Sequence, residues 1–142
     1  MFLLVSMAIT TSGFTADLSK APELVFEGKL ERQVLVGKVD ADTPAKVKVL
    51  LKIQNNRFQV INDDVTRLLF MDEQFAGRHI RLTAVVVAGT TSTLKVKKVQ
   101  TVVDGKVFDV DYWCERCQLA ATEPGKCRCC GGDTVLRELP AK

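Results

Sequence analysis

All five cysteines of the chain lie close together near its C-terminus. Four of them form two Cys-x-x-Cys pairs, Cys114/Cys117 and Cys127/Cys130, which are separated by nine residues. Two such pairs at this separation are typical of four thiolates that bind one tetrahedral ion, for which Zn²⁺ is the usual metal. We therefore expect these four side chains to be metal ligands. Cys129 is then either a free thiol or an alternative ligand.

The residues around the two pairs also suit a thiolate site. Gly131 and Gly132 follow the second pair and leave backbone N–H groups free to bond sulfur. Gln118 follows the first pair, where it predicts a less favourable turn. Four thiolates around a divalent ion carry a net charge of about −2. Arg116 and Lys126 lie inside the motif, where their positive charges can offset it.

The stretch from residue 112 to 137 resembles known metal-binding modules. An aromatic pair, Tyr112 and Trp113, precedes the first cysteine, and the second pair lies in the sequence Pro-Gly-Lys-Cys-x-x-Cys-Gly. These features are similar to short zinc ribbons, to the rubredoxin-like tail domain of rubrerythrins and to the heavy-metal-binding domain of copper-efflux proteins. The last family usually has His at the position of Cys117, and rubredoxin-like domains usually have a wider gap. The resemblance implies a closed structural zinc site, with iron as the alternative.

Two other fates of the cysteines remain open at this stage. In an oxidising compartment, four of the thiols would pair as disulfides and leave the fifth free. A redox-active iron or dithiol site would make the chain an electron-transfer or thiol-redox protein. The two aromatic residues before Cys114 are expected to pack over the metal site or between it and the rest of the chain.

The first 16 residues carry no charge and begin with an apolar run. This pattern resembles a secretory signal, although no Lys or Arg precedes the apolar run. The stretch is too short to span a membrane comfortably, since a transmembrane helix needs about 20 residues. We expect an exported protein, periplasmic or secreted, with residues 17–23 as a linker and no transmembrane segment in the mature chain. If residues 1–16 are retained, the protein would be cytoplasmic.

Residues 24–111 predict a mainly β domain with one helix. Strand patterns occur at 33–39, 45–53 and 57–61, after a short apolar stretch at 24–28, and again at 79–87, 94–103 and 107–113. The helix follows a capping sequence at 62–64, and its apolar residues are Val65, Leu68 and Leu69. We expect Gly77 to end it and a bulge at Lys97-Lys98 to break the later strand. Three strands, a helix and two strands is the element order of a small OB-like β-barrel.

The expected barrel surface gives little indication of a partner. Lys46, Lys48 and Lys52 share one face of a strand, which is typical of a solvated or edge-protecting face. Phe58 is the one aromatic residue near the surface where such barrels stack bases, and it lies on the expected core face. With 20 Lys and Arg against 17 Asp and Glu, the net charge of +3 does not require a nucleic acid. A nucleic-acid-binding protein is therefore the least favoured alternative.

No set of residues in the sequence indicates catalysis. The chain has one histidine, His79, and no Ser/His/Asp set or glycine-rich phosphate loop. Four sulfur ligands would leave the ion no open position for water or substrate. The sequence therefore predicts a non-catalytic metal-binding protein, in which residues 112–142 form a four-cysteine zinc-ribbon-like module on an OB-like domain that binds an unknown protein or small molecule.

Overall fold

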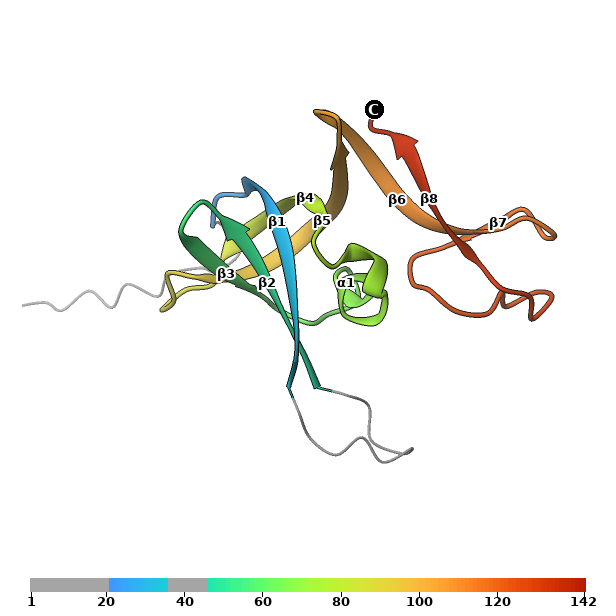
Figure 1. Cartoon of the computed structure of the whole chain (residues 1–142), viewed down its shortest axis with the longest axis horizontal. Helices are drawn as coiled ribbons and strands as arrows, with labels where there is room; N and C mark the ends of the chain where they lie inside the picture. Colours follow the sequence, from blue (N-terminus) through green and yellow to red (C-terminus); the bar gives the residue numbers. More distant parts are fainter. Residues whose placement is uncertain (1–20, 36–45) are drawn as a thin grey trace, which may run out of the picture.

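The computed structural model describes residues 21–35 and 46–142, and most of them form β-strands (Figure 1). The expected signal at 1–16, most of the linker, the end of the 33–39 strand and the turn at 40–44 lie outside this described part. The strands are β1 (Leu24–Leu35), β2 (Lys46–Ile53), β3 (Asn56–Val60), β4 (His79–Val86), β5 (Thr93–Val103), β6 (Lys106–Cys114), β7 (Leu119–Ala121) and β8 (Val135–Pro140). Between β3 and β4 lie the short helix α1 (Arg67–Met71) and the 3₁₀ turn η2 (Glu73–Phe75).

The first five strands close into a barrel. β1 pairs antiparallel with both β2 and β4, β2 pairs with β3, and β4 pairs with β5. The barrel closes where β3 and β5 run parallel, through Gln59 opposite Thr93 and Val60 opposite Leu94. The helix lies between the third and fourth strands, so the expected OB-like barrel is confirmed.

The barrel core follows the predicted alternation of side chains. On β2, Val49 and Leu51 are fully buried, whereas Lys46 is exposed and Lys48 and Lys52 are half-buried. On β4, Ile80, Leu82 and Ala84 are fully buried in the same way. Leu50 is also buried, at 7 % exposure, although it belongs to the lysine-bearing face of β2. Phe58 is partly buried and its ring lies 5.4 Å from that of Phe26, so it packs against the core as expected.

The short apolar stretch at 24–28 and the start of the 33–39 strand belong to one continuous strand, β1. The sequence suggested a break because Gly28 and the charged residues after it interrupt the apolar pattern. The glycine is required by a close approach, since a Cβ at this position would lie 2.2 Å from the carbonyl oxygen of Lys52 on β2.

The helix is shorter than its capping sequence suggested. The Asp63 carboxylate accepts hydrogen bonds from the N–H groups of Val65 (3.0 Å) and Thr66 (3.1 Å), so it caps a turn rather than the helix itself. α1 then runs for five residues from Arg67 and buries Leu68 and Leu69. A positive φ of 77° at Gly77 marks the turn into β4. The predicted cap and stop therefore exist, and much of the segment between them is turn and 3₁₀ structure.

Beyond the barrel, β6 leads into the module of residues 112–142, which holds the five cysteines. The predicted bulge is confirmed, because Thr83 pairs with Lys98 and Ala84 with Val96, which leaves Lys97 without an opposite residue. β6 pairs with β5 at its start, with β7 at its end and with β8 along its other edge. Figure 1 shows β6 and β8 leading away from the barrel together. Strand β8 was not expected from the sequence.

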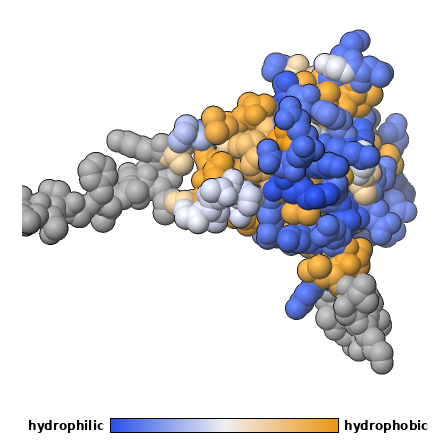
Figure 2. Space-filling model, turned by 60° about the vertical axis from the view of Figure 1, so that its left-hand side comes forward, coloured by the Kyte–Doolittle hydropathy of each residue, from blue (hydrophilic) through white to orange (hydrophobic). Residues whose placement is uncertain are grey.

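Apolar side chains gather at one end of the barrel surface. Figure 2 shows them beside the point where the described chain begins, while much of the remaining visible surface is hydrophilic. Leu24 and Val25, at the start of β1, are 47 % and 61 % exposed. None of the helices in the described ranges has the length and apolar character needed to cross a membrane.

Candidate metal centre

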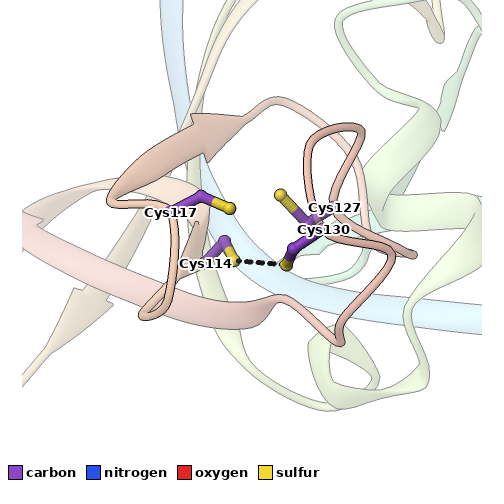
Figure 3. Close-up of side chains that lie close together, drawn as sticks. All are labelled: Cys114, Cys117, Cys127 and Cys130. Atoms are coloured by element: carbon purple, nitrogen blue, oxygen red, sulfur yellow. Dashed lines mark hydrogen bonds between the residues drawn. The ribbon is translucent and has the colours of Figure 1, made fainter.

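Two turns bring the four predicted ligands together. Cys114 ends β6, and Cys117 lies in the turn between β6 and β7. Cys127 and Cys130 lie in a second turn between β7 and β8, and Figure 3 shows the two pairs facing each other. An isolated bridge between Lys126 and Asp133 closes the base of the second turn. The sulfurs of the two turns therefore meet on one side of the β6–β7 hairpin.

The spacing of the sulfurs fits a tetrahedral ion. All four Sγ atoms lie within 4.8 Å of one another, and Cys114 Sγ is 3.6 Å from Cys130 Sγ. Zinc–sulfur bonds of about 2.3 Å in a tetrahedron place sulfurs about 3.8 Å apart. A disulfide requires about 2.05 Å, and all five cysteines are free in the structure. Cys114 and Cys127 are buried, whereas Cys117 and Cys130 are half-buried.

The two turns have the same backbone form. In the first, the N–H of Gln118 donates to the carbonyl of Cys114 at 2.7 Å, and in the second the N–H of Gly131 donates to the carbonyl of Cys127 at 2.9 Å. Gln118 and Gly131 both have positive φ, 54° and 68°. This conformation costs a residue with a side chain about 1 kcal/mol or more, and glycine tolerates it. The first turn is therefore the less favourable of the two, as its sequence suggested.

Backbone N–H groups are directed at the sulfurs. Those of Cys117 and Arg116 act to lower the pKa of Cys114, and those of Cys130 and Cys129 act to lower the pKa of Cys127. The N–H of Gly132 donates to Cys130 Sγ at 3.4 Å. Such donors stabilise thiolates and fix the direction of their lone pairs. A side chain at Gly132 would place its Cβ 3.2 Å from this sulfur, which explains a glycine there.

The thiols influence one another's ionisation. The N–H groups of Cys130 and Cys129 lower the pKa of Cys127 to about 7. Hydrogen bonds with the Cys129 and Cys130 thiols raise the pKa of Cys117. The N–H of Cys117 lowers the pKa of Cys114, but burial and the Cys127 and Cys130 thiols raise it more, so its net shift is upward. Four thiols this close cannot all ionise alone, and a central cation would allow all four to do so.

The other predicted residues take different positions. Cys129 is exposed and lies outside the group of four converging sulfurs. Lys126 forms an ion pair with Asp133 at 2.5 Å, so its charge is directed at that carboxylate. Arg116 is exposed, and its backbone N–H acts to lower the pKa of Cys114.

Trp113 lies on the opposite face of β6 from the sulfur of Cys114. The guanidinium carbon of Arg137, on β8, lies 3.9 Å from the centre of its ring. Arg137 also makes two hydrogen bonds to the Asp111 carboxylate, at 2.9 and 2.6 Å, and this carboxylate raises the pKa of the guanidinium. The ring is thus covered by a cation–π contact rather than placed over the sulfurs.

Contacts that the sequence did not indicate fix the module to the barrel. The Tyr112 hydroxyl donates to the buried Asp72 carboxylate at 2.7 Å, and Asp72 also accepts from the N–H of Gln74 in η2. Burial and this hydrogen bond raise the pKa of Tyr112. Glu138, on β8, pairs with Arg78 and accepts from Thr101 Oγ1 at 2.6 Å. These partners are 37 to 60 residues apart in sequence, so no local pattern could reveal them.

Comparison with known proteins assigns no family. No family model, no curated protein and no solved structure matches the chain. The cysteine cluster and the barrel therefore rest on the chain's own geometry. The one histidine, His79, is 52 % exposed and lies 3.4 Å from Glu27, far along the chain from the cysteines.

Proposed function

We propose that the protein is an exported, non-catalytic metal-binding protein in which a structural Zn²⁺ folds the C-terminal module. The observation that carries this proposal is the convergence of four sulfurs from two matching turns, all within 4.8 Å of one another. Four thiolates form a closed coordination shell, which leaves no position for a water or substrate to react.

The donor set and its surroundings support a structural zinc ion over a hard cation. Soft thiolate ligands in a tetrahedral arrangement select Zn²⁺ or iron over hard cations such as Mg²⁺ or Ca²⁺. Within residues 112–142 the buried side chains are few, namely Tyr112, Cys114 and Cys127. A segment with so small a core gains its stability from metal binding, which is the role of a structural zinc ion.

Export and a binding or scaffold role of the barrel complete the proposal. The uncharged, apolar pattern of residues 1–16 supports export. The barrel is a closed five-stranded domain, a scaffold that commonly presents a binding surface for a partner. Here the partner would be a protein or small molecule, because the described part of the barrel carries no row of exposed aromatic residues to stack bases.

The test is elemental analysis combined with thiol counting on protein isolated from its native compartment. We expect one zinc ion per chain and, in the native protein, one reactive thiol, that of Cys129. Absorption in the visible region would show iron instead, because an iron tetrathiolate is coloured and zinc is not. Two disulfides with no bound metal would overturn the proposal.

A further inference from the structure

A pocket outside the metal centre lies where the barrel meets the module. Its volume is about 430 Å³, and it is bordered by the turn that leads into α1, by β5, by β6 and by Thr122 after β7. Its floor is apolar and its rim is charged: the floor is formed by Val65, Leu68, Val99 and Val110, and two rim residues are Lys97 and Lys98. This volume is in the range of small-molecule sites, about 300–1,000 Å³.

The bulge in β5 creates the charged side of this pocket. In a regular strand, successive side chains point to opposite faces, so two neighbouring lysines would separate. Here Lys97 has no partner on β4, and both Lys97 and Lys98 are exposed before the buried Val99. Bulges next to binding sites commonly serve to redirect a side chain in this way. Two ammonium groups therefore stand at the edge of an apolar floor.

One of the two lysines at the rim has no carboxylate partner among the described ion pairs. Lys98 Nζ pairs with the Asp109 carboxylate at 2.9 Å, and this contact together with Gln100 lowers the pKa of Asp109. Asp64, also at the rim, pairs with Arg67 at 2.5 Å, and Arg67 pairs in addition with Glu123 at 3.1 Å. Among the ion pairs found in the described ranges, none includes Lys97. The Lys97 ammonium group is thus the one at the rim that can pair with an anionic group of a ligand.

The apolar part of the pocket is open to a ligand. Val65 is 40 % exposed, although its neighbours Leu68 and Val99 are buried to 6 % and 8 % exposure. A ligand body placed against Val65 and Val110 would remove this apolar surface from water. The pocket therefore suits a small molecule that has an apolar body and one anionic group.

We propose that this pocket binds a small amphiphilic anion, with its apolar body over Val65, Val99 and Val110 and its anionic group at Lys97. This inference rests on the proposed function, in which the barrel binds an unknown partner, and it assigns that partner a chemical class. Because Thr122 follows β7 of the metal module, the far wall of the pocket depends on the module being folded. Metal content is therefore measured on every sample, so that loss of the ion and failure of the pocket are distinguished.

The experiment is a fluorescence titration of the metal-loaded full chain with anilinonaphthalenesulfonate, which has an aromatic body and one sulfonate. Phenylnaphthylamine, the same body without the charge, is the second probe. We expect saturable binding of the sulfonate, and Lys97→Gln should weaken it about tenfold. Binding of the neutral probe should be weaker than that of the sulfonate in the unaltered chain, and Lys97→Gln should leave it unchanged.

Lys95→Gln is the matched control. Lys95 is exposed on the same strand, two residues from Lys97, and does not border the pocket. We expect this variant to bind both probes as the unaltered chain does. Amide chemical shifts recorded during the titration should change around residues 64–68, 97–99, 109–110 and 122. Equal effects of the two lysine substitutions, shift changes elsewhere, or no saturable binding in a chain that holds its ion would each overturn the proposal.

Discussion

The barrel and the metal module bury different kinds of side chain. The barrel encloses a continuous apolar cluster that includes Leu30, Leu51 and Leu82, all fully buried. In residues 112–142, two of the three buried side chains are those of the cysteines Cys114 and Cys127. Apolar burial stabilises the first region without help from any ligand, whereas the second has too little of it. The comparison implies that the two regions should respond to different perturbations.

Removing a sulfur ligand should have the largest effect, and only on the module. For Cys114→Ser or Cys130→Ser, we expect bound zinc to fall from one ion per chain to nearly none and the module to unfold. The barrel should stay folded, because its core contains neither residue. Structural zinc contributes on the order of 10 kcal/mol to such modules. Elemental analysis and amide hydrogen exchange measure the two parts separately.

Cys129→Ser is the control for these ligand variants. Cys129 is exposed and lies outside the group of four converging sulfurs. Its substitution should leave metal content unchanged. Loss of zinc in Cys129→Ser, together with retention in Cys130→Ser, would show that the ligand assignment is wrong.

Truncating a core side chain should destabilise the barrel and leave the metal content unchanged. Phe75 is fully buried in η2. Phe75→Ala should lower the free energy of unfolding of the barrel by about 3–5 kcal/mol, because it leaves a cavity. Urea denaturation followed by far-ultraviolet circular dichroism measures the loss. Met71, 53 % exposed at the end of α1, gives the control Met71→Ala, with a change below about 0.5 kcal/mol. In conditions where the barrel stays folded, zinc content should not change.

The contact between the two regions should have an intermediate effect. Tyr112→Phe removes the hydroxyl that bonds the buried Asp72 carboxylate and leaves that carboxylate with one donor fewer. We expect a loss of about 1–2 kcal/mol in the free energy of unfolding, with zinc content unchanged. Urea denaturation monitored by Trp113 fluorescence measures it. An unchanged unfolding midpoint would mean that this hydrogen bond does not hold the module to the barrel.

The smallest expected effects are changes in zinc affinity when the two cysteine turns are altered in opposite directions. Gln118→Gly should relieve the strain of a positive φ and raise zinc affinity, by less than about 1 kcal/mol because glycine also loses more entropy on folding. Gly131→Ala imposes the same strain on the second turn and should lower affinity by about 1–2 kcal/mol. Competition with a chelator measures both. Opposite signs are the expected result, and equal signs would contradict the equivalence of the turns.

Much of the barrel could be predicted because its signals are local. Alternation fixed the inward faces of β2 and β4, and the break in alternation at Lys97-Lys98 located the bulge. The continuity of β1 was missed because Gly28 is explained by the carbonyl of Lys52 on another strand. The extent of α1 was overestimated because the Asp63 cap stabilises a turn as well as it would a helix.

The candidate metal site also has parts that could be predicted from the sequence and parts that could not. The four ligands and the weaker first turn could be predicted from spacing and from Gln118 in place of glycine. The partner of Lys126 could not, since Asp133 approaches it across the second turn. Strand β8 was missed because its pattern, with Arg137 and Glu138 at its centre, does not alternate clearly between apolar and polar. Its place is set by pairing with β6 and by contacts to Trp113, Asp111 and Arg78.

Strand β6 belongs both to the barrel's neighbouring strands and to the cysteine cluster. It enters from the turn after β5 and ends on the first sulfur ligand, so no flexible tether separates the two regions. A tensile load on the module would reach the barrel along this strand. Release of the ion would begin as fraying at Cys114 and would next disturb Tyr112 and its partner Asp72 beside η2. If the proposed zinc ion binds there, loss of the ion would be felt at the barrel's helical end.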